Sequence, residues 1–597
     1  MSSEGREQDL TDEATQTPRE DVVELAKRRG FFFQSNEPYG GVAGFYTFGP
    51  QGAALKRNVE DAWRERFTVA AGNHEIESPT VMPEPVFEAS GHLDGFDDML
   101  VECPECGESH RADHLVEDAT EIEEAESLPI PEVESVVAEY EITCPTCGAG
   151  LAGESVEPFN LMFETNIGPG SSSPGYLRPE TAQGMFVDFP RFKEYARNQL
   201  PFGLTQIGRA YRNEISPRNA IVRVREFTQA ELELFVDPET DEPPIEEVAD
   251  VALPLYSAER QEEDETADPV EMTVADAIEE GVITEPWIAY YLGVARRWYE
   301  RIGVDMNRFR YRQHLPGERA HYAADCWDAE TEVHGDWIEV TGFAYRGDYD
   351  LSKHDKHGEG EFTIFEQYDD PVTVERPTVD PDMSYLGPEF GGKAREVVDA
   401  LEELAARDPD AFDDEDVTVE VDGEELVVPV EATSFTVEEV TEHGEHLTPH
   451  VVEPSFGVDR LVYTLLVHGY HEDVVDEEVR THLALDPEVA PTFVGVFPLL
   501  SELEGRAREL TERLREAGLA AAYDDSGSIG RRYRRQDEVG TPFCVTLDER
   551  TTEEDTVTVR ERDSTEQVRI EIETLVETLS ALREGELSFA ELEDAER

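Results

Sequence analysis

Apolar and polar positions alternate most clearly between 204 and 235, where two strand-like runs are joined by a polar loop over 216–219. Successive side chains of a strand point to opposite faces, so residues two apart share a face. In the second run we expect one face to carry Arg223, Arg225, Phe227, Gln229, Glu231 and Glu233, and the other Val222, Val224, Ala230, Leu232 and Leu234. The first face then presents guanidinium groups, an aromatic ring and carboxylates, which we expect to line a cavity.

Other patterns predict the elements around these two strands. A helix is expected over 58–71, followed by a strand that ends near 83, and 337–346 reads as an aromatic strand. An apolar strand is expected at Val451 and Val452, leading through Glu453, Ser455 and Gly457 into a helix with Arg460 in its first turn. After 486–487, strand patterns alternate with a helix over 501–517, which predicts a separate C-terminal α/β domain of about 110 residues.

Composition divides the rest of the chain. Residues 1–20 are polar and are expected to form a flexible acidic tail. The acidic segments 237–285 and 371–448 are expected to be insertions at the surface, the second with a helix over 394–406 and a hairpin around Asp422 and Gly423. The expected order of segments is 1–20, 21–100, 101–150, 151–236, 237–285, 286–370, 371–448, 449–486 and 487–597.

Charge changes this picture. The 597 residues include 136 acidic and 50 basic ones, for a net charge of −86, and only six of the basic residues are lysine. Hydrophobic residues at 39% and aromatic residues at 9% are too many for a disordered acidic chain, so the charge belongs to a folded surface. A lysine-poor carboxylate surface is expected of a halophilic protein, because the Debye length falls to about 3 Å in molar salt.

The sequence also excludes some classes of protein. Such a charge excludes the basic composition that is usual in nucleic-acid-binding proteins, and it excludes a polybasic membrane anchor. It does not exclude nucleic acid as a partner, although no DNA partner is expected. No signal-peptide pattern and no apolar run of about 18 residues is present, so we expect a soluble cytoplasmic protein without a membrane partner.

Four cysteines form two CxxC pairs, Cys103 with Cys106 and Cys144 with Cys147, separated by 37 residues. Each pair is followed by a glycine, which permits the tight turn of a zinc knuckle, and four thiolates can bind Zn²⁺ tetrahedrally. We therefore expect structural zinc, with redox-active or free thiols as the alternative. Cys326 and Cys544 are expected to be isolated and buried.

The strand residues favour nucleotide chemistry. Arg212 and Glu214 end the first run, and arginine forks suit phosphate oxygens while an aromatic ring can stack on a base. A solvated strand face would not explain Phe227 among these charges. The helix N-terminus at Arg460 also attracts phosphate. Residues 387–393 nearly match a phosphate-binding loop, but Ala394 replaces the Ser or Thr that such a loop needs for Mg²⁺, so we interpret that match as accidental.

These motifs together resemble a known enzyme family. RNE (212–214) with REF (225–227), and GVDR (457–460), are similar to motifs 2 and 3 of class II aminoacyl-tRNA synthetases, and the helix 58–71 with Pro79 resembles motif 1. The strings YLRPETAQGMF (176–186), RNEISPR (212–218), REFTQAELE (225–233), CWDAE (326–330), WIEVTG (337–342) and EPSFG (453–457) resemble glycyl-tRNA synthetases of the α2 type.

The resemblance implies an α+β protein. Its catalytic domain would have an antiparallel sheet built from 21–100, 151–236, 286–370 and 449–486, with motifs 1, 2 and 3 in the first, second and last of these segments. A four-cysteine, zinc-ribbon-like insertion would occupy 101–150, the acidic insertions would interrupt the catalytic domain, and 487–597 would be an anticodon-binding domain.

The implied reaction activates glycine with ATP and Mg²⁺ to glycyl-adenylate and then transfers glycyl to the 3′-terminal adenosine of tRNA(Gly). By similarity, Arg212 grips the α-phosphate, Glu214 meets the adenine amino group, Phe227 stacks on the base, Arg460 holds the γ-phosphate and Glu339 is the Mg²⁺ ligand. The implied catalytic residues are Arg212, Glu214 and Arg460. The implied ATP-binding residues are Arg212, Asn213, Glu214, Val222, Arg223, Val224, Arg225, Glu226, Phe227, Glu339, Val340, Gly457, Val458, Asp459 and Arg460.

Glycine recognition must rely on the ammonium group, because glycine has no side chain. By similarity, Glu180, Glu231 and Glu453 surround that group, and steric exclusion of alanine discriminates by about 1–3 kcal/mol per methyl group. The implied glycine-binding residues are Arg111, Glu180, Phe227, Thr228, Gln229, Ala230, Glu231, Glu453, Pro454, Ser455, Phe456 and Gly457.

The run 527–542 is the densest basic patch of the chain, with Arg531, Arg532, Tyr533, Arg534 and Arg535. We expect it to contact tRNA, with neutralisation of neighbouring acids as the alternative. The resemblance also implies a homodimer, because motif 1 builds the dimer interface in this class.

Three other functions are weighed against this one. A non-catalytic RNA-binding relative would lack Arg212 or Arg460, which are both present. A class II synthetase for proline, threonine or serine is disfavoured by the three glutamates with EPSFG. A zinc hydrolase would need an open metal site, which four cysteines do not provide.

Overall fold

The computed structural model describes residues 19–120, 122, 125, 128–169, 173–217, 220–263, 267–315, 325–421, 424–475 and 478–596. The chain divides into two compact units. The larger runs to Phe362 and resumes at Pro449, and the smaller is Thr363–Thr448. The expected tail over 1–20 lies outside the described residues except for 19 and 20.

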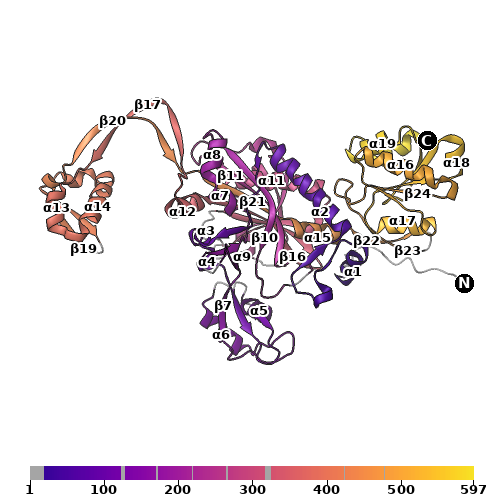
Figure 1. Ribbon diagram of the computed structural model, residues 1–597, viewed down its shortest axis with the longest axis horizontal. Coiled ribbons are helices and arrows are strands. Elements are labelled where there is room, and N and C mark those ends of the chain that lie inside the picture. The colour runs from indigo at the N-terminus through magenta and orange to yellow at the C-terminus, as the bar shows by residue number, and fades with distance from the viewer. Residues whose placement is uncertain are drawn as a thin grey trace. The chain divides into compact units, whose positions relative to one another are not determined.

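A nine-stranded sheet forms the centre of the larger unit (Figure 1). Its order is β13 (Val270–Thr273), β12 (Ala252–Tyr256), β14 (Phe309–Gln313), β15 (Cys326–Val333), β16 (Asp336–Gly347), β21 (His450–Gly457), β11 (Glu226–Val236), β10 (Phe202–Tyr211) and β3 (His74–Glu75). The pairs are antiparallel except β12 with β14 and β10 with β3. The predicted antiparallel catalytic sheet is therefore confirmed.

Helices α11 (Pro286–Arg301) and α15 (Val458–His468) pack on this sheet, and α2 (Pro50–Trp63) packs against α15. Phe456 of β21 contacts both α2 and α11, because its ring centroid lies 5.8 Å from that of Trp63 and 5.4 Å from that of Trp298. Each such ring contributes roughly 2–3 kcal/mol through burial. The motif 1 helix begins at Pro50, earlier than the expected 58, because a proline is favoured in the first helical turn.

The acidic segment 237–285 was expected to be an insertion at the surface, but the structure contradicts this expectation. It supplies β12 and β13 to the central sheet, and Leu253 and Leu255 are buried in the main core. The acidic composition concealed an alternation of apolar residues that packs against α11.

The cysteine-bearing segment forms a small body with its own core. A three-stranded sheet in the order β6 (Ser109–Arg111), β5 (Asp97–Glu102), β7 (Val156–Asn160) packs with α5 (Ala112–Ala119) and α6 (Ile130–Glu139).

The smaller unit is a long antiparallel ribbon, β17 (Ile364–Thr378) with β20 (Thr436–Leu447), that carries a compact α/β body. Figure 1 draws the ribbon and this body in orange. The body contains α13 (Met383–Phe390), α14 (Ala394–Arg407), β18 (Asp416–Val421) and β19 (Glu424–Pro429). The predicted helix over 394–406 and the predicted hairpin strands are confirmed, while the turn at 422–423 lies outside the described residues.

The predicted C-terminal α/β pattern is also confirmed. A five-stranded sheet has the order β25 (Ala521–Tyr523), β24 (Val494–Pro498), β26 (Phe543–Leu547), β27 (Thr556–Glu561), β28 (Gln567–Glu571). Its helices are α16 (Glu504–Glu516), α17 (Ile529–Asp537), α18 (Glu549–Glu554), α19 (Leu575–Arg583) and α20 (Phe589–Glu596).

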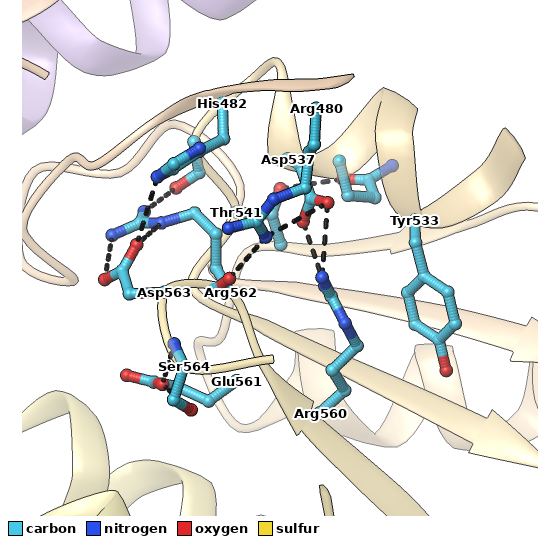
Figure 2. Close-up of polar contacts among 12 residues, drawn as sticks. Arg480, His482, Tyr533, Asp537, Thr541, Arg560, Glu561, Arg562, Asp563 and Ser564 are labelled. Atoms are coloured by element: carbon cyan, nitrogen blue, oxygen red, sulfur yellow. Dashed lines mark hydrogen bonds and ion pairs between the residues drawn. The ribbon is translucent and has the colours of Figure 1, made fainter. Parts of the chain in front are cut away.

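A hairpin that the sequence patterns did not indicate, β22 (Tyr470–Val475) with β23 (Glu478–Leu483), connects α15 to this domain. Figure 2 shows its anchor, where buried Asp537 of α17 accepts hydrogen bonds from Arg560 at 2.9 and 3.3 Å and lies 3.5 Å from Arg480 of β23. Arg480 also donates to the carbonyl of Arg562 at 2.6 Å. One carboxylate thus pairs with two guanidinium groups that would be costly to bury alone.

The remaining elements are α1 (Arg19–Arg29), β1 (Phe32–Gln34), β2 (Tyr46–Phe48), the π-helix Arg64–Val69, β4 (Val81–Pro83), α3 (Glu84–Ala89), α4 (His92–Gly95), β8 (Phe163–Asn166), β9 (Pro174–Leu177), α7 (Gln183–Val187), α8 (Phe189–Tyr195), α9 (Ala258–Glu263), α10 (Val274–Glu279) and α12 (Tyr349–His357). Within the described ranges, none of the helices is both long enough and apolar enough to cross a membrane.

Candidate active site

A pocket lies where β11, β16 and β21 meet the first turn of α15. Its lining residues are Arg212, Glu214, Ile221, Val222, Arg223, Val224, Phe227, Thr228, Gln229, Glu339, Val340, Ser455, Gly457, Asp459 and Arg460. The fold thus brings together three sequence segments that are more than a hundred residues apart. All of these residues except Ile221 are among those the sequence predicted for ATP or glycine.

Arg212 lies against two aromatic rings. Its guanidinium carbon lies 5.4 Å from the ring centroid of Phe96 and 5.4 Å from that of Phe227, and its Nε donates to the carbonyl of Pro179 at 3.3 Å. Contacts between a planar guanidinium and aromatic rings limit its rotation.

A chain of charges links the pocket to the cysteine-bearing body. Arg223 Nε donates to the Glu214 carboxylate at 2.5 Å, and its Nη2 lies 3.5 Å from Asp98. Asp98 also pairs with Arg111 at 3.2 Å, and burial raises the pKa of Asp98 to about 6. Arg111 was expected to contact substrate, but it lies outside the pocket lining. It is linked to Arg223 through Asp98, which pairs with both residues.

The expected alternation fails at its beginning. Strand β11 starts at Glu226, so the segment 222–225 lies outside this strand. The Arg225 guanidinium turns away from the pocket and donates to the carbonyls of Glu214 at 2.7 Å and Ala43 at 2.8 Å. Glu226 lies 3.7 Å from Arg209 and is also outside the lining. The loop residues 218 and 219 lie outside the described residues.

Arg460 enters the pocket from α15. Its Nη1 donates to the backbone carbonyl of Glu339 at 2.8 Å and to its carboxylate at 3.0 Å, and its Nε donates to the carbonyl of Val222 at 3.1 Å. The helix N-terminus and this guanidinium together favour an anion at this end of the pocket.

Lys56 of α2 is a functional candidate that the sequence analysis missed. Its ammonium group donates to Asp459 at 2.6 Å and to Thr228 Oγ1 at 2.6 Å, with 7% of the residue exposed. It thereby holds Thr228 of β11 and Asp459 of α15 in place. The scarcity of lysine in the sequence could have pointed to this residue, because the chain contains only six lysines.

The predicted glycine carboxylates lie behind Ser455. Ser455 Oγ donates to Glu231 at 2.6 Å, and Thr181 donates to the other oxygen of Glu231. Glu453 accepts from Arg346 Nη1 at 2.6 Å, and Arg346 was not predicted as a site residue. Burial raises the pKa of Glu231 and raises that of Glu453 to about 7.

Glu180 stands slightly apart, accepting from Gln183 at 2.9 Å with His92 at 3.7 Å. Burial would raise the pKa of Glu180, but the charges of His92 and Arg346 outweigh it and keep the pKa low. Of the other predicted residues, Ala230, Pro454, Phe456 and Val458 bury their side chains, so only their main chain can face a substrate. Asn213 lies next to the lining, and its N–H donates to the carbonyl of Leu161 at 2.7 Å.

Cys326 is not isolated, contrary to expectation. It is half-buried, and its sulfur lies within 4.8 Å of ligand atoms of His314 and Asp328, which are hydrogen-bonded to each other at 2.8 Å. Cys544 is buried, as expected.

The four knuckle cysteines converge. Their sulfur atoms lie within 4.8 Å of one another, with Cys103 to Cys147 at 3.6 Å and Cys106 to Cys144 at 3.7 Å. Tetrahedral Zn²⁺ with bonds of about 2.3 Å would place the sulfurs about 3.8 Å apart, so the cluster fits zinc. Gly107 and Gly148 have φ of 71° and 76° and close the two turns, as the spacing predicted.

The predicted basic patch is not one exposed surface. Arg532 is buried and donates to the carbonyls of Pro498, Asp525 and Gly527 at 2.6, 2.8 and 3.0 Å. Arg534 pairs with Glu478, and Arg535 pairs with Asp524. The hydroxyl group of Tyr533 is hydrogen-bonded to the hydroxyl group of Thr546 at 2.6 Å, and its ring lies beside Arg560 (Figure 2). Arg531 is exposed.

Two family models match the chain. Residues 173–468 match the tRNA synthetase class II core domain (G, H, P, S and T), and residues 494–582 match the anticodon binding domain. The first match contains every residue of the pocket lining, and the second contains α17 with its arginines.

Similar curated proteins come from archaea and match over nearly their whole length. The chain is 48% identical over 578 residues to a glycine--tRNA ligase of Methanothrix thermoacetophila, covering 96% of this chain and 98% of that protein. It is 46% identical over 569 residues to a glycine--tRNA ligase of Methanothermobacter thermautotrophicus, covering 94% and 99%. A glycine--tRNA ligase of Archaeoglobus fulgidus is 46% identical over 574 residues, covering 96% and 98%.

Proposed function

Because the chain belongs to the family of glycine--tRNA ligases, we propose that its pocket activates glycine with ATP and that the glycyl group is then transferred to the 3′-terminal adenosine of tRNA(Gly). In the first step a carboxylate oxygen of glycine attacks the α-phosphorus of ATP, and pyrophosphate leaves with the electron pair of the broken P–O bond. In the second step the ribose hydroxyl of the tRNA attacks the glycyl carbonyl, and AMP leaves.

Arg212 is the group proposed to stabilise the first transition state. Negative charge grows on the phosphoryl oxygens there, and a pre-positioned donor of this kind is worth about 3–4 kcal/mol. The rings of Phe96 and Phe227 support this role because they hold the guanidinium before substrate arrives. Phe227 would in turn stack on adenine, with Glu214 accepting from its amino group.

Arg460 would hold the far end of the triphosphate at the N-terminus of α15. Glu339 is the carboxylate proposed to hold Mg²⁺, an ion that neutralises charge on the phosphates during transfer. Its oxygen ligand suits that ion, and its position beside Arg460 supports the assignment.

Glycine would place its ammonium toward Glu231 and Glu453, past Ser455. These carboxylates attract the ammonium, and the tightly packed strands behind them leave a larger side chain no space. This arrangement would exclude alanine by steric conflict with β11 and β21.

Further parts of the proposal rest on the family and on composition. We propose structural zinc at the four cysteines, tRNA contact through the C-terminal domain, a homodimer, a cytoplasmic location and adaptation to high salt. The cysteine geometry supports the first, and the anticodon-domain match supports the second.

The observation that carries the proposal is the convergence of Arg212, Phe227 and Arg460 on one pocket. Amino-acid-dependent ATP–pyrophosphate exchange in molar KCl tests it, with glycine compared to alanine, serine, proline and threonine. We expect exchange with glycine alone. A folded protein inactive with every amino acid would instead indicate a non-catalytic RNA-binding relative.

A further inference from the structure

Glu233 lies on β11 two residues beyond Glu231, and it is completely buried. Among the residues that the structure describes, no hydrogen-bond donor reaches either of its carboxyl oxygens. Its two acidic neighbours differ in this respect, because Glu231 accepts from Ser455 and Glu453 accepts from Arg346. A buried carboxylate without a donor is far less stable than a neutral carboxylic acid.

The three carboxyl groups are crowded together. One oxygen from each of Glu231, Glu233 and Glu453 lies within 4.8 Å of the others. Three negative charges at this separation in a buried site would repel one another strongly. At least one of the three groups must therefore carry a proton before any cation arrives.

The charged groups around this cluster come from every neighbouring element. They are Glu231 of β11, Glu453 of β21, Arg346 of β16, Asp350 of α12, and the more distant Glu180, Arg178 and His92. Arg346 is shared, since it donates to Asp350 at 2.7 and 3.1 Å as well as to Glu453. Acids outnumber bases here, and burial followed by the charge of Glu453 raises the pKa of Glu233 well above its ordinary value.

We propose that Glu233 stays a neutral carboxylic acid and acts as a positioning residue for glycine, donating its proton to the Glu453 carboxylate. This inference rests on the proposed function of the site. The neutral acid adds no third charge to the cluster, so Glu453 can ionise near neutral pH. Its hydrogen bond and that of Arg346 together hold Glu453 in place for the ammonium group.

Infrared difference spectroscopy tests the protonation state without relying on activity. The spectrum of Glu233→Gln is subtracted from that of the full wild-type chain at about pH 8.5, where Glu453 has lost its proton. We expect a carbonyl band of a protonated carboxylic acid in the wild type. Absence of that band would show that Glu233 is ionised, with or without a bound cation, and would overturn the proposal.

Exchange kinetics test the positioning role. Glu233→Met removes the donor and keeps a similar side-chain volume. We expect the KM for glycine to rise about tenfold or more, because one hydrogen bond to a charged group is lost. The KM for ATP should be unchanged. Glu233→Gln restores a neutral donor and is expected to recover most of that loss. Glu88→Gln, an exposed carboxylate of α3, is the matched control.

Two results would contradict the role. If Glu233→Gln raised the KM for glycine as much as Glu233→Met does, glycine binding would require the negative charge of Glu233 itself. If Glu233→Met raised the KM for ATP equally, the residue would be only structural. An inactive wild type would refute the proposed function, while the infrared result would still decide the state of Glu233.

Discussion

Arg460 and Glu339 form an ion pair in the lining of the pocket, with 3.0 Å between Nη1 and the carboxylate. Each has a proposed partner of opposite charge, the γ-phosphate for Arg460 and Mg²⁺ for Glu339. In the proposed function, the pair keeps both groups in position before ATP binds, and each group would then exchange this contact for its proposed partner.

Glu339→Gln should uncouple these two roles. The amide cannot neutralise the metal ion, so we expect the Mg²⁺ concentration for half-maximal exchange to rise and kcat to fall about 100-fold. Exchange kinetics over a Mg²⁺ titration provide the measurement. An unchanged Mg²⁺ dependence would remove Glu339 from the metal site.

Arg212→Ala should abolish glycyl-adenylate formation, lowering exchange by about 100- to 1,000-fold while the fold is retained. Arg212→Lys keeps the charge but loses the planar group that packs against Phe96 and Phe227, so it should recover little activity. Circular dichroism checks the fold of both variants. Substantial activity in the alanine variant would overturn the assigned role.

The KM for glycine should depend on pH through Glu453. Burial raises the pKa of this group to about 7, and only its ionised form attracts the ammonium. As the pH rises from 6 to 7, the KM for glycine should therefore fall about fivefold, and above about 8 it should become constant. Exchange kinetics between pH 6 and 9 measure this, and Glu453→Gln should abolish the pH dependence.

The same group affects stability with the opposite sign. Its folded-state pKa lies above the ordinary glutamate value of 4.5, so its contribution to folding stability is complete below about pH 4.5 and is lost as the pH rises through 7. Substrate binding and folding thus favour different protonation states of Glu453.

Cys147→Ser should release one equivalent of zinc per chain and unfold the small body around the knuckles. Because Arg111 from that body pairs with Asp98 beside Arg223, the KM for ATP should rise as well. Metal analysis and exchange kinetics measure the two effects. Thr146→Ala, an exposed change in the same knuckle, should show neither.

The arginines of α17 should separate into two classes. Arg531→Gln should raise the KM for tRNA a few-fold without affecting exchange, because Arg531 is exposed. Arg532→Gln should lower the free energy of unfolding by about 3 kcal/mol, because three backbone carbonyls lose a charged donor. Aminoacylation kinetics and urea unfolding distinguish them, and equal effects of both on tRNA would contradict the division.

Local periodicity predicted much of the site. The residues from Phe227 to Glu233 alternate as expected, because β11 is continuous there and its register sets Glu231 opposite Ser455. The orientation of Arg225 could not be predicted, because it depends on the carbonyl of Ala43, which lies 182 residues away in the sequence.

The partners of buried charged side chains also could not be predicted from the sequence. Lys56 meets Asp459 over a separation of 403 residues, and Arg346 meets Glu453 over 107. A helix or strand pattern shows which face is apolar, but it does not show which distant carboxylate a buried cation will meet. Acidic composition likewise obscured β12 and β13, whose few apolar residues are enough to join the central sheet.

The ribbon of the smaller unit begins and ends as a pair, with Ile364 opposite Leu447. The two ends of this excursion therefore lie next to each other. Closing a loop between such ends costs only about 0.6 kcal/mol more for each doubling of its length. Evolution can lengthen, shorten or exchange this excursion without rebuilding the sheet, which makes it a place where related enzymes can diverge while their chemistry stays the same.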